Sequence, residues 1–256
     1  SLISFFYFKG PVFLQEQNTI PGSVSKLLFS TNKVSKIFCG FEKTKIFFEE
    51  FNKKYIKLIN TGNPVGKIKT AIDKSSNLSG FNILVMGGSQ GSKFLNEFTP
   101  NVLSGVKNKI SIKIKHQCGR NNFFNVENAY SSLDDDIFIT EFIKDIDEAY
   151  QWADLVISRS GALTVSEIIA SRSAAILVPI KISIDDHQKE NANFLASNKA
   201  AWILEETDYF SEELKKLLEL ILENEESILE KKENIAQIEV RDSETIIFNE
   251  VNAWYQ

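Results

Sequence analysis

Short apolar segments alternate with segments of helical periodicity from residue 80 onward. Six apolar segments have the length of strands, at 82–86, 110–115, 136–140, 155–158, 175–178 and 201–204. The pattern predicts helices between them, at 91–103, 124–131, 146–152, 162–171 and 186–198. Apolar strands that alternate with helices indicate a parallel sheet covered by helices on both faces. We therefore expect an α/β fold.

The first 66 residues show the same pattern less completely. Strands are predicted at 11–14 and 35–39, with a helix at 23–31 between them. Turn-forming residues at 61–66 and a polar stretch at 73–80 then separate an N-terminal part (1–66) from a C-terminal part (67–240). Two further helices are predicted at 211–234 and 244–254. We expect the final segment, 241–256, to pack back on the N-terminal part.

Composition narrows the class of protein. A hydrophobic content of 43% and a charged content of 25% fit an ordinary globular chain. The net charge of -5 argues against nucleic acid as a partner, because phosphate binding needs a basic surface. Cys39 and Cys118 stand in unrelated contexts, which favours a reducing compartment over a disulfide. No apolar run has the length of a membrane span. Because the chain starts at Ser1, we expect its beginning to be missing.

The first loop that suggests chemistry is GGSQG at 87–91. Its glycines permit positive φ angles and a close approach of a ligand to the backbone. The hydroxyl of Ser89 and the N–H groups of the following helix are suited to a phosphate. The loop matches neither the dinucleotide fingerprint nor a P-loop, because Lys93 lies two residues past Gly91. A tight turn with a serine N-cap remains an alternative interpretation.

The second loop is SRSGALTVSE at 158–167. Gly161, Ala162 and Leu163 keep bulky polar groups away from the amino end of a helix, whose unpaired N–H groups and partial positive charge suit a pyrophosphate. Thr164 adds a hydroxyl, and the carboxylate of Glu167, one turn on, is suited to the hydroxyls of a ribose. The alternative is a capping box, in which Thr164 starts the helix and pairs with Glu167.

The third loop is DDHQ at 185–188. The amide of Gln188 can both donate to and accept from sugar hydroxyls. His187 is suited to the role of a general base or of a simple helix-start residue. Asp185 and Asp186 favour the positive end of a helix over a metal site, and we expect neither a metal nor a cofactor. Because all three loops follow strands of one sheet, they predict a nucleotide-diphosphate sugar as ligand.

The same motifs resemble the MurG family of N-acetylglucosaminyltransferases. They occur in one order: EQN at 16–18, GNPV at 62–65, GGSQG at 87–91, TEFI at 140–143, RSGALTVSE at 159–167 and DHQKENA at 186–192. The resemblance implies a GT-B architecture, with two Rossmann-like domains of which the N-terminal one is incomplete here. It also implies an inverting transfer of N-acetylglucosamine from UDP-N-acetylglucosamine to lipid I, which gives lipid II in peptidoglycan synthesis.

The resemblance also implies roles for individual residues and a location for the protein. Ile143 should contact the uracil through its backbone, and Glu167 should bind the ribose. Gln188, and Asn18 from the other domain, should hold the sugar. The diphosphate should lie against Ser89 and the helix start formed by Gly161, Ala162, Leu163 and Thr164. The family works on the cytoplasmic face of the bacterial inner membrane, so lipid I and cell-wall synthesis proteins are the expected partners.

The chain departs from the family pattern at three places. Gly66 replaces an arginine, whose contact with the donor Lys67 would have to supply, and Gln15 replaces a histidine. The family's N-terminal glycine-rich loop, with its proposed catalytic histidine, has no counterpart. We therefore assign no catalytic residue, and we predict that His116, placed after a strand, is structural.

Three alternatives to this function stay open. The first is a UDP-sugar-binding fragment without activity, and the second is another GT-B transferase of the same family. The third is a nicotinamide oxidoreductase, for which the sequence shows no fingerprint.

Overall fold

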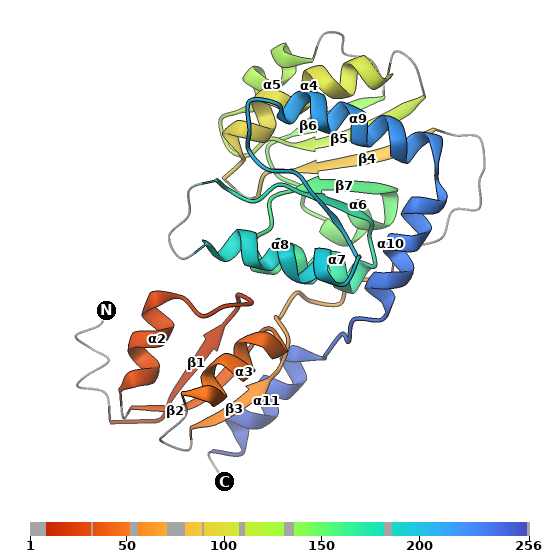
Figure 1. The fold of residues 1–256 in the computed structure, drawn as a ribbon. Helices are drawn as coiled ribbons and strands as arrows, with labels where there is room; N and C mark the ends of the chain where they lie inside the picture. The colour runs from red at the N-terminus through yellow and green to blue at the C-terminus, as the bar shows by residue number, and fades with distance from the viewer. Residues whose placement is uncertain are drawn as a thin grey trace.

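The computed structural model describes residues 9–31, 33–51, 56–70, 80–88, 90–107, 111–130, 136–181 and 186–254. These residues form two lobes, each built on a parallel β-sheet (Figure 1). The smaller lobe holds the N-terminal strands, and the larger lobe holds the chain from residue 81 until its last helix returns to the smaller lobe. Parallel strands joined by helices confirm the predicted α/β class.

The smaller lobe is a three-stranded sheet in the order β1-β2-β3. Its elements are, along the chain, β1 (Val12–Glu16), α2 (Ser23–Ser30), β2 (Val34–Cys39), α3 (Glu42–Glu50) and β3 (Lys57–Asn60). Ile37 of the central strand and Phe48 of α3 belong to one small apolar core. The sequence pattern missed α3 and β3, because charged residues interrupt the apolar positions there and α3 buries only Thr44 and Phe48.

The larger lobe is a six-stranded sheet in the order β6-β5-β4-β7-β8-β9. Its strands are β4 (Phe81–Met86), β5 (Ile112–Gln117), β6 (Ile137–Thr140), β7 (Leu155–Ser158), β8 (Ala175–Leu177) and β9 (Trp202–Ile203). Its helices are α4 (Lys93–Lys107), α5 (Phe123–Ala129), α6 (Ile146–Trp152), α7 (Ala162–Ser171), α8 (His187–Ser197), α9 (Phe210–Glu223) and α10 (Glu226–Ala236).

The two faces of the larger sheet are covered by different helices. Ile83 and Val85 of β4 pack with α4, α5 and α9, whereas Leu84 and Met86 pack with α6, α7 and α8. This alternation is the period of two that a strand imposes on its side chains. Both faces are therefore buried, as the near-continuous apolar strands predicted.

One predicted helix is wrong. The segment 211–234 forms two helices, α9 and α10, instead of one. The backbone N–H and the hydroxyl of Ser227 both donate to the carbonyl of Asn224, at 3.1 and 2.8 Å, and close a turn between the helices. Asparagine and serine favour such local bonds over a helix interior, and this was the signal in the sequence.

The last helix, α11 (Ser243–Asn252), lies against the sheet of the smaller lobe (Figure 1). Glu250 pairs with Lys36 at 2.9 Å and with Lys57 at 2.8 Å, and the rings of Phe13 and Trp254 are 6.0 Å apart. The chain therefore enters and leaves the larger lobe from the same side. The division of the chain at residues 66 and 240 stays a prediction. No described helix has the length and apolar character of a membrane span.

Candidate functional site

Three predicted loops lie at one edge of the larger sheet. Strand β7 pairs with β4 and with β8, and the last paired residues of the three strands, Met86, Ser158 and Leu177, are in register. The chain leaves these strand ends toward α4, α7 and α8. Because the carboxyl ends of parallel strands share one edge, the amino ends of the three helices lie side by side there.

The glycines of the first loop are required by the fold itself. Gly88 and Gly91 have φ angles of 84° and 79°, and a Cβ atom on Gly91 would lie 2.1 Å from the carbonyl oxygen of Cys118. The hydroxyl of Ser92 accepts from the N–H of Leu95 at 3.2 Å. A serine cap is therefore present at residue 92. Ser89 lies outside the described residues, and its contact with a phosphate stays a prediction.

The second loop opens helix α7 without a side-chain cap. The helix begins at Ala162 after Gly161, and no described side chain bonds the N–H groups of its first turn. Among the described residues, a Cβ atom on Gly161 would meet only the hydroxyl of Thr164, at 3.8 Å. The capping-box interpretation is wrong, because the helix starts before Thr164 and Glu167 bonds Tyr150 instead. The first turn therefore offers unpaired N–H groups to a ligand.

Glu167 is half-buried, one helical turn beyond Leu163. Burial raises the pKa of its carboxyl group, and a hydrogen bond from the hydroxyl of Tyr150 opposes that rise. The Tyr150 oxygen lies 3.0 Å from Oε2 of Glu167. Burial also raises the pKa of Tyr150 well above its usual value, so the phenol donates and Glu167 accepts. The second oxygen of Glu167 is the one suited to a ribose hydroxyl.

The third loop is tied to the second. The hydroxyl of Ser160, just before α7, donates to the carbonyl of Gln188 in α8 at 2.8 Å. The side-chain oxygen of Gln188 accepts from the N–H of Ile180 at 3.3 Å. These bonds bring the start of α8 against the start of α7, as the predicted ligand requires. A direct contact of Gln188 with a sugar stays a prediction.

Gln117 joins two predicted parts of the site, and sequence reasoning missed it. Its side-chain oxygen accepts from the N–H of Ile143 at 2.9 Å, and its Nε2 donates to the carbonyl of Gly88 at 3.0 Å. The loop expected to hold uracil is therefore bonded to the glycine loop. Because the N–H of Ile143 is used, its carbonyl is the backbone group left for a base. The signal available in the sequence was the position of Gln117 at the end of a strand, here β5, where ligand-site residues of parallel sheets lie.

Asn18 lies in the smaller lobe within a loop that Glu16 organises. The buried carboxylate of Glu16 accepts from the N–H of Asn18 at 3.0 Å, from its Nδ2 at 3.1 Å and from the N–H of Gly22 at 3.1 Å. The side-chain oxygen of Asn18 accepts from Asn191 of α8 at 3.1 Å. Asn18 therefore reaches the helix that carries Gln188, and one N–H of its amide remains for a sugar.

The two histidines of the chain lie in strand β5 and at the start of α8. His116 lies inside β5, not after a strand as predicted, and is fully buried. Its ring nitrogens bond Tyr130 at 3.0 Å and Asn96 at 3.1 Å, and burial lowers its pKa to about 3. His116 is therefore neutral and structural. His187 is the first residue of α8 and lies near Gly22 of the smaller lobe.

The departures from the family pattern have visible consequences. Gly66 is exposed with a φ angle of 71°, a conformation that glycine adopts at little cost. An arginine at this position would start from a strained backbone. The buried amide atoms of Gln15 have no hydrogen-bond partner among the described residues. Gly66 thus suits the left-handed backbone found at this position, and Gln15 leaves its amide without a partner among the described residues.

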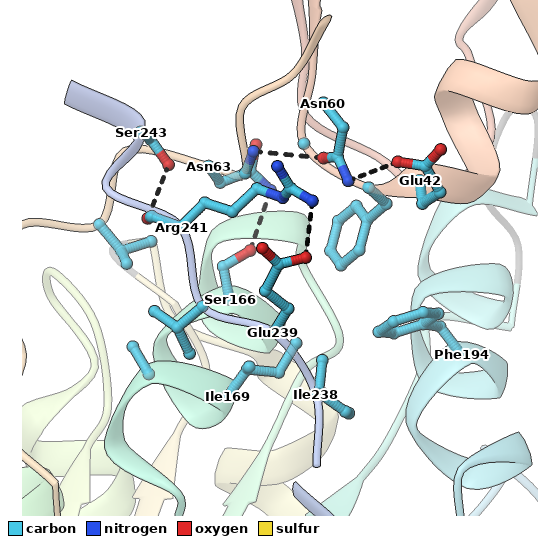
Figure 2. Close-up of a pocket in the computed structure, with 16 residues that line it drawn as sticks. Glu42, Asn60, Asn63, Ser166, Ile169, Phe194, Ile238, Glu239, Arg241 and Ser243 are labelled. Atoms are coloured by element: carbon cyan, nitrogen blue, oxygen red, sulfur yellow. Dashed lines mark hydrogen bonds and ion pairs between the residues drawn. The ribbon is translucent and has the colours of Figure 1, made fainter. Parts of the chain in front are cut away.

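A separate cavity of about 200 Å³ lies where the two lobes meet (Figure 2). Ile169, Phe194 and Ile238 form an apolar side, whereas Glu42 and Arg241 lie on the polar side. None of the eight described residues that the sequence predicted for a ligand lines it. The cavity is therefore distinct from the loops at the strand ends.

Comparison with known proteins identifies the family. Residues 82–245, more than half of the chain, match the glycosyltransferase family 28 C-terminal domain. The chain belongs to glycosyltransferase family 28. Its match covers the strands β4 to β9 and every helix that opens at the candidate site.

Curated relatives of this family-28 chain share one name, UDP-N-acetylglucosamine--N-acetylmuramyl-(pentapeptide) pyrophosphoryl-undecaprenol N-acetylglucosamine transferase. The protein of Shewanella pealeana is 40% identical over 200 residues, which cover 76% of this chain and 52% of that protein. The protein of Shewanella violacea is 34% identical over 239 residues, which cover 91% and 63%. The chain thus spans between half and two thirds of the length of these relatives.

Solved structures agree. Acinetobacter baumannii MurG matches with a TM-score of 0.76 and 28% identity over 98% of this chain and 69% of that one. S. aureus MnaA, solved with UDP, matches with a TM-score of 0.70 at 12% identity, which concerns the fold alone. The resemblance to the MurG family and the GT-B architecture are therefore confirmed.

Proposed function

We propose that the chain binds UDP-N-acetylglucosamine and forms the donor-binding part of an enzyme that transfers N-acetylglucosamine to lipid I. The observation that carries this proposal is the uncapped amino end of α7, set between the glycine loop and the start of α8. The name that the curated relatives share supports the donor and the acceptor.

The donor would lie along the strand ends. The diphosphate would accept hydrogen bonds from the N–H groups of Ala162, Leu163 and Thr164, with Ser89 on its other side. The free oxygen of Glu167 would take the ribose, and the carbonyl of Ile143 would take the uracil. Gln188 and Asn18 would hold the sugar, since Asn191 connects the loops that carry them.

The transfer itself creates negative charge on the leaving diphosphate. When the acceptor hydroxyl attacks the anomeric carbon, the bond to the phosphate oxygen breaks and the sugar inverts. Fixed N–H groups and the helix dipole at α7 stabilise that charge more strongly in the transition state than in the bound donor. The start of α7 would therefore speed the reaction as well as bind the substrate.

The base that takes the proton from the acceptor comes from outside the described residues in this proposal. His116 is buried and neutral, and His187 belongs to the donor loop. The acceptor, a membrane lipid, implies work at the cytoplasmic face of the membrane, where other cell-wall proteins act. The histidine observation also favours a second candidate, a chain that binds the donor without transferring the sugar.

Calorimetry and a transfer assay test both candidates. We expect binding of UDP-N-acetylglucosamine, with UDP as competitor, and no binding of NADH. Release of UDP with formation of lipid II from labelled donor and lipid I would establish the transferase. Binding without turnover would support the second candidate, and the absence of binding would refute both.

A further inference from the structure

The cavity between the lobes is bounded by both segments that connect them (Figure 2). Asn63 and Val65 belong to the first connection, between β3 and β4, and residues 238–241 belong to the second, between α10 and α11. The smaller lobe contributes Phe41 to the lining, and helix α7 of the larger lobe contributes Ile169. A molecule in this cavity would therefore touch both lobes and both connections.

The apolar side of the cavity is suited to one ring or one branched side chain. Phe41 and Ile169 are buried there, and Phe194 and Ile238 are half-buried. The rings of Phe41 and Phe194 meet edge to face across the boundary of the lobes, with their centroids 5.2 Å apart. An engineered apolar cavity of about 150 Å³ holds a benzene molecule. The volume of about 200 Å³ here thus accommodates a ring with a short polar group.

The polar side of the cavity carries charges of both signs. Nη2 of Arg241 donates to Oε2 of Glu239 at 2.6 Å, which uses one nitrogen of the guanidinium and one oxygen of the carboxylate. Glu42 accepts from Nδ2 of Asn60 at 2.7 Å and pairs with Lys45 at 3.2 Å. A guanidinium has five N–H donors and a carboxylate accepts about four hydrogen bonds, so these bonds leave positions for a ligand.

This arrangement of charges favours a zwitterion over an ion of one sign. A ligand with only a negative group would meet the carboxylates of Glu42 and Glu239, and a ligand with only a positive group would meet the guanidinium of Arg241. A free amino acid carries an ammonium and a carboxylate on the carbon atom that bears its side chain. Its two charges can therefore face the polar side while its side chain lies against the apolar side.

We propose that the cavity binds a free amino acid with an apolar side chain. Its carboxylate pairs with Arg241, its ammonium pairs with Glu42 and Glu239, and its side chain packs on Ile169 and Phe194. Such an occupant holds the two lobes in one arrangement, because it bridges both connections. The cavity is distinct from the loops at the strand ends, so this assignment does not depend on the proposed donor.

Calorimetry with three ligands that share one ring tests the chemistry of the site. L-Phenylalanine carries both charges, phenethylamine lacks the carboxylate, and 3-phenylpropionate lacks the ammonium. We expect L-phenylalanine to bind and each of the other two to bind at least about threefold more weakly, because each loses charge-assisted hydrogen bonds. The absence of L-phenylalanine binding, or equal affinity for either of the other two, overturns the assignment.

Two variants test whether the ligand occupies this cavity. Arg241→Gln should weaken L-phenylalanine binding at least about threefold and should not weaken phenethylamine binding, because phenethylamine has no carboxylate. Arg120→Gln, at an exposed position after β5, makes the same change of charge and should leave both affinities unchanged. Ala170→Leu places a larger side chain in the lining and should abolish binding. Full affinity for L-phenylalanine in Arg241→Gln overturns the assignment even if Ala170→Leu does not melt cooperatively.

Amide hydrogen exchange tests whether the occupant bridges the lobes. Saturating L-phenylalanine should slow exchange in the connections, at residues 61–65 and 237–242, and should leave α5 on the far part of the larger lobe unchanged (Figure 1). Unchanged exchange in both connections overturns the assignment. A chain that binds L-phenylalanine but not UDP overturns the proposed function alone, and the reverse result overturns this assignment alone.

Discussion

Replacing Glu167 with glutamine tests the ribose contact with little disturbance of the fold. The hydroxyl of Tyr150 donates to Oε2 of Glu167 at 3.0 Å, and the oxygen of a glutamine amide can still accept that bond. Alanine would instead leave the buried hydroxyl of Tyr150 without its partner, which costs about 1–3 kcal/mol. Glu167→Gln therefore removes the negative charge and keeps the local structure.

Because the one amide oxygen of the glutamine takes the bond from Tyr150, its Nε2 replaces the free carboxylate oxygen and can only donate to a ribose hydroxyl. The expected loss is therefore the difference between a charged and a neutral hydrogen bond. A hydrogen bond to a charged group is worth about 1.5–3 kcal/mol, and a neutral one about 0.5–1.5 kcal/mol. One ribose hydroxyl on the free oxygen thus predicts a loss of about 1–1.5 kcal/mol, which is roughly a five- to tenfold rise in Kd for UDP. Calorimetry at fixed salt measures it, with Glu212→Gln on the exposed face of α9 as the control.

The thermal stability of Glu167→Gln should rise, whereas its affinity for UDP should fall. Burial raises the pKa of Glu167 in the folded chain above its usual value of 4.5, despite the hydrogen bond from Tyr150. The folded state thus favours the protonated form, so the contribution of this group is fully present below pH 4.5 and is lost as the pH rises through the raised pKa. Glu167→Gln cannot ionise. The melting temperature of this variant minus that of wild type should therefore increase as the pH rises through the raised pKa of Glu167.

Both results together distinguish a ligand role from a structural one. Weaker UDP binding with equal or higher thermal stability is the expected pair. An unchanged Kd for UDP would remove Glu167 from the ribose contact. A lower melting temperature at neutral pH would contradict the account of its burial.

Three further changes test other parts of the structure. Ala162→Asp should abolish detectable UDP binding in calorimetry, because a carboxylate at the start of α7 repels the diphosphate, and retained binding would place the phosphate elsewhere. Gly91→Ala should lower the free energy of unfolding in urea for two reasons. Its left-handed backbone costs roughly 1–2 kcal/mol and the contact of the new Cβ with Cys118 about 1–3 kcal/mol. An unchanged free energy of unfolding would contradict the loop geometry. Tyr130→Phe should cost about 1–3 kcal/mol in the same measurement, because it leaves a buried nitrogen of His116 unpaired, and a neutral result would contradict that hydrogen bond.

The sequence predicted the larger lobe more fully than the smaller one. Strand β7 and helices α6 and α7 match their predicted bounds, because their apolar periods are uninterrupted. In the smaller lobe, α3 mixes five charged residues with its apolar ones over nine positions, and the period is lost. Buried sheets impose clear patterns on a sequence, whereas a half-exposed helix does not.

The candidate site was predictable as loops but not as a network. Strand ends and small residues pointed to the starts of α4, α7 and α8, since those features are local. The roles of Gln117 and Asn191 depend on partners 29 and 172 residues away, such as Gly88 and Thr19. Such pairs become visible only when the register of the sheet and the approach of the lobes are known.

The central claim is that the uncapped start of α7 holds the pyrophosphate of a uridine-linked sugar. A crystal structure of this chain with UDP-N-acetylglucosamine measures it directly. The account predicts phosphate oxygens at hydrogen-bond distance, about 2.7–3.2 Å, from the N–H groups of Leu163 and Thr164. A nucleotide bound in the cavity between the lobes, or with its phosphates turned away from α7, would contradict it.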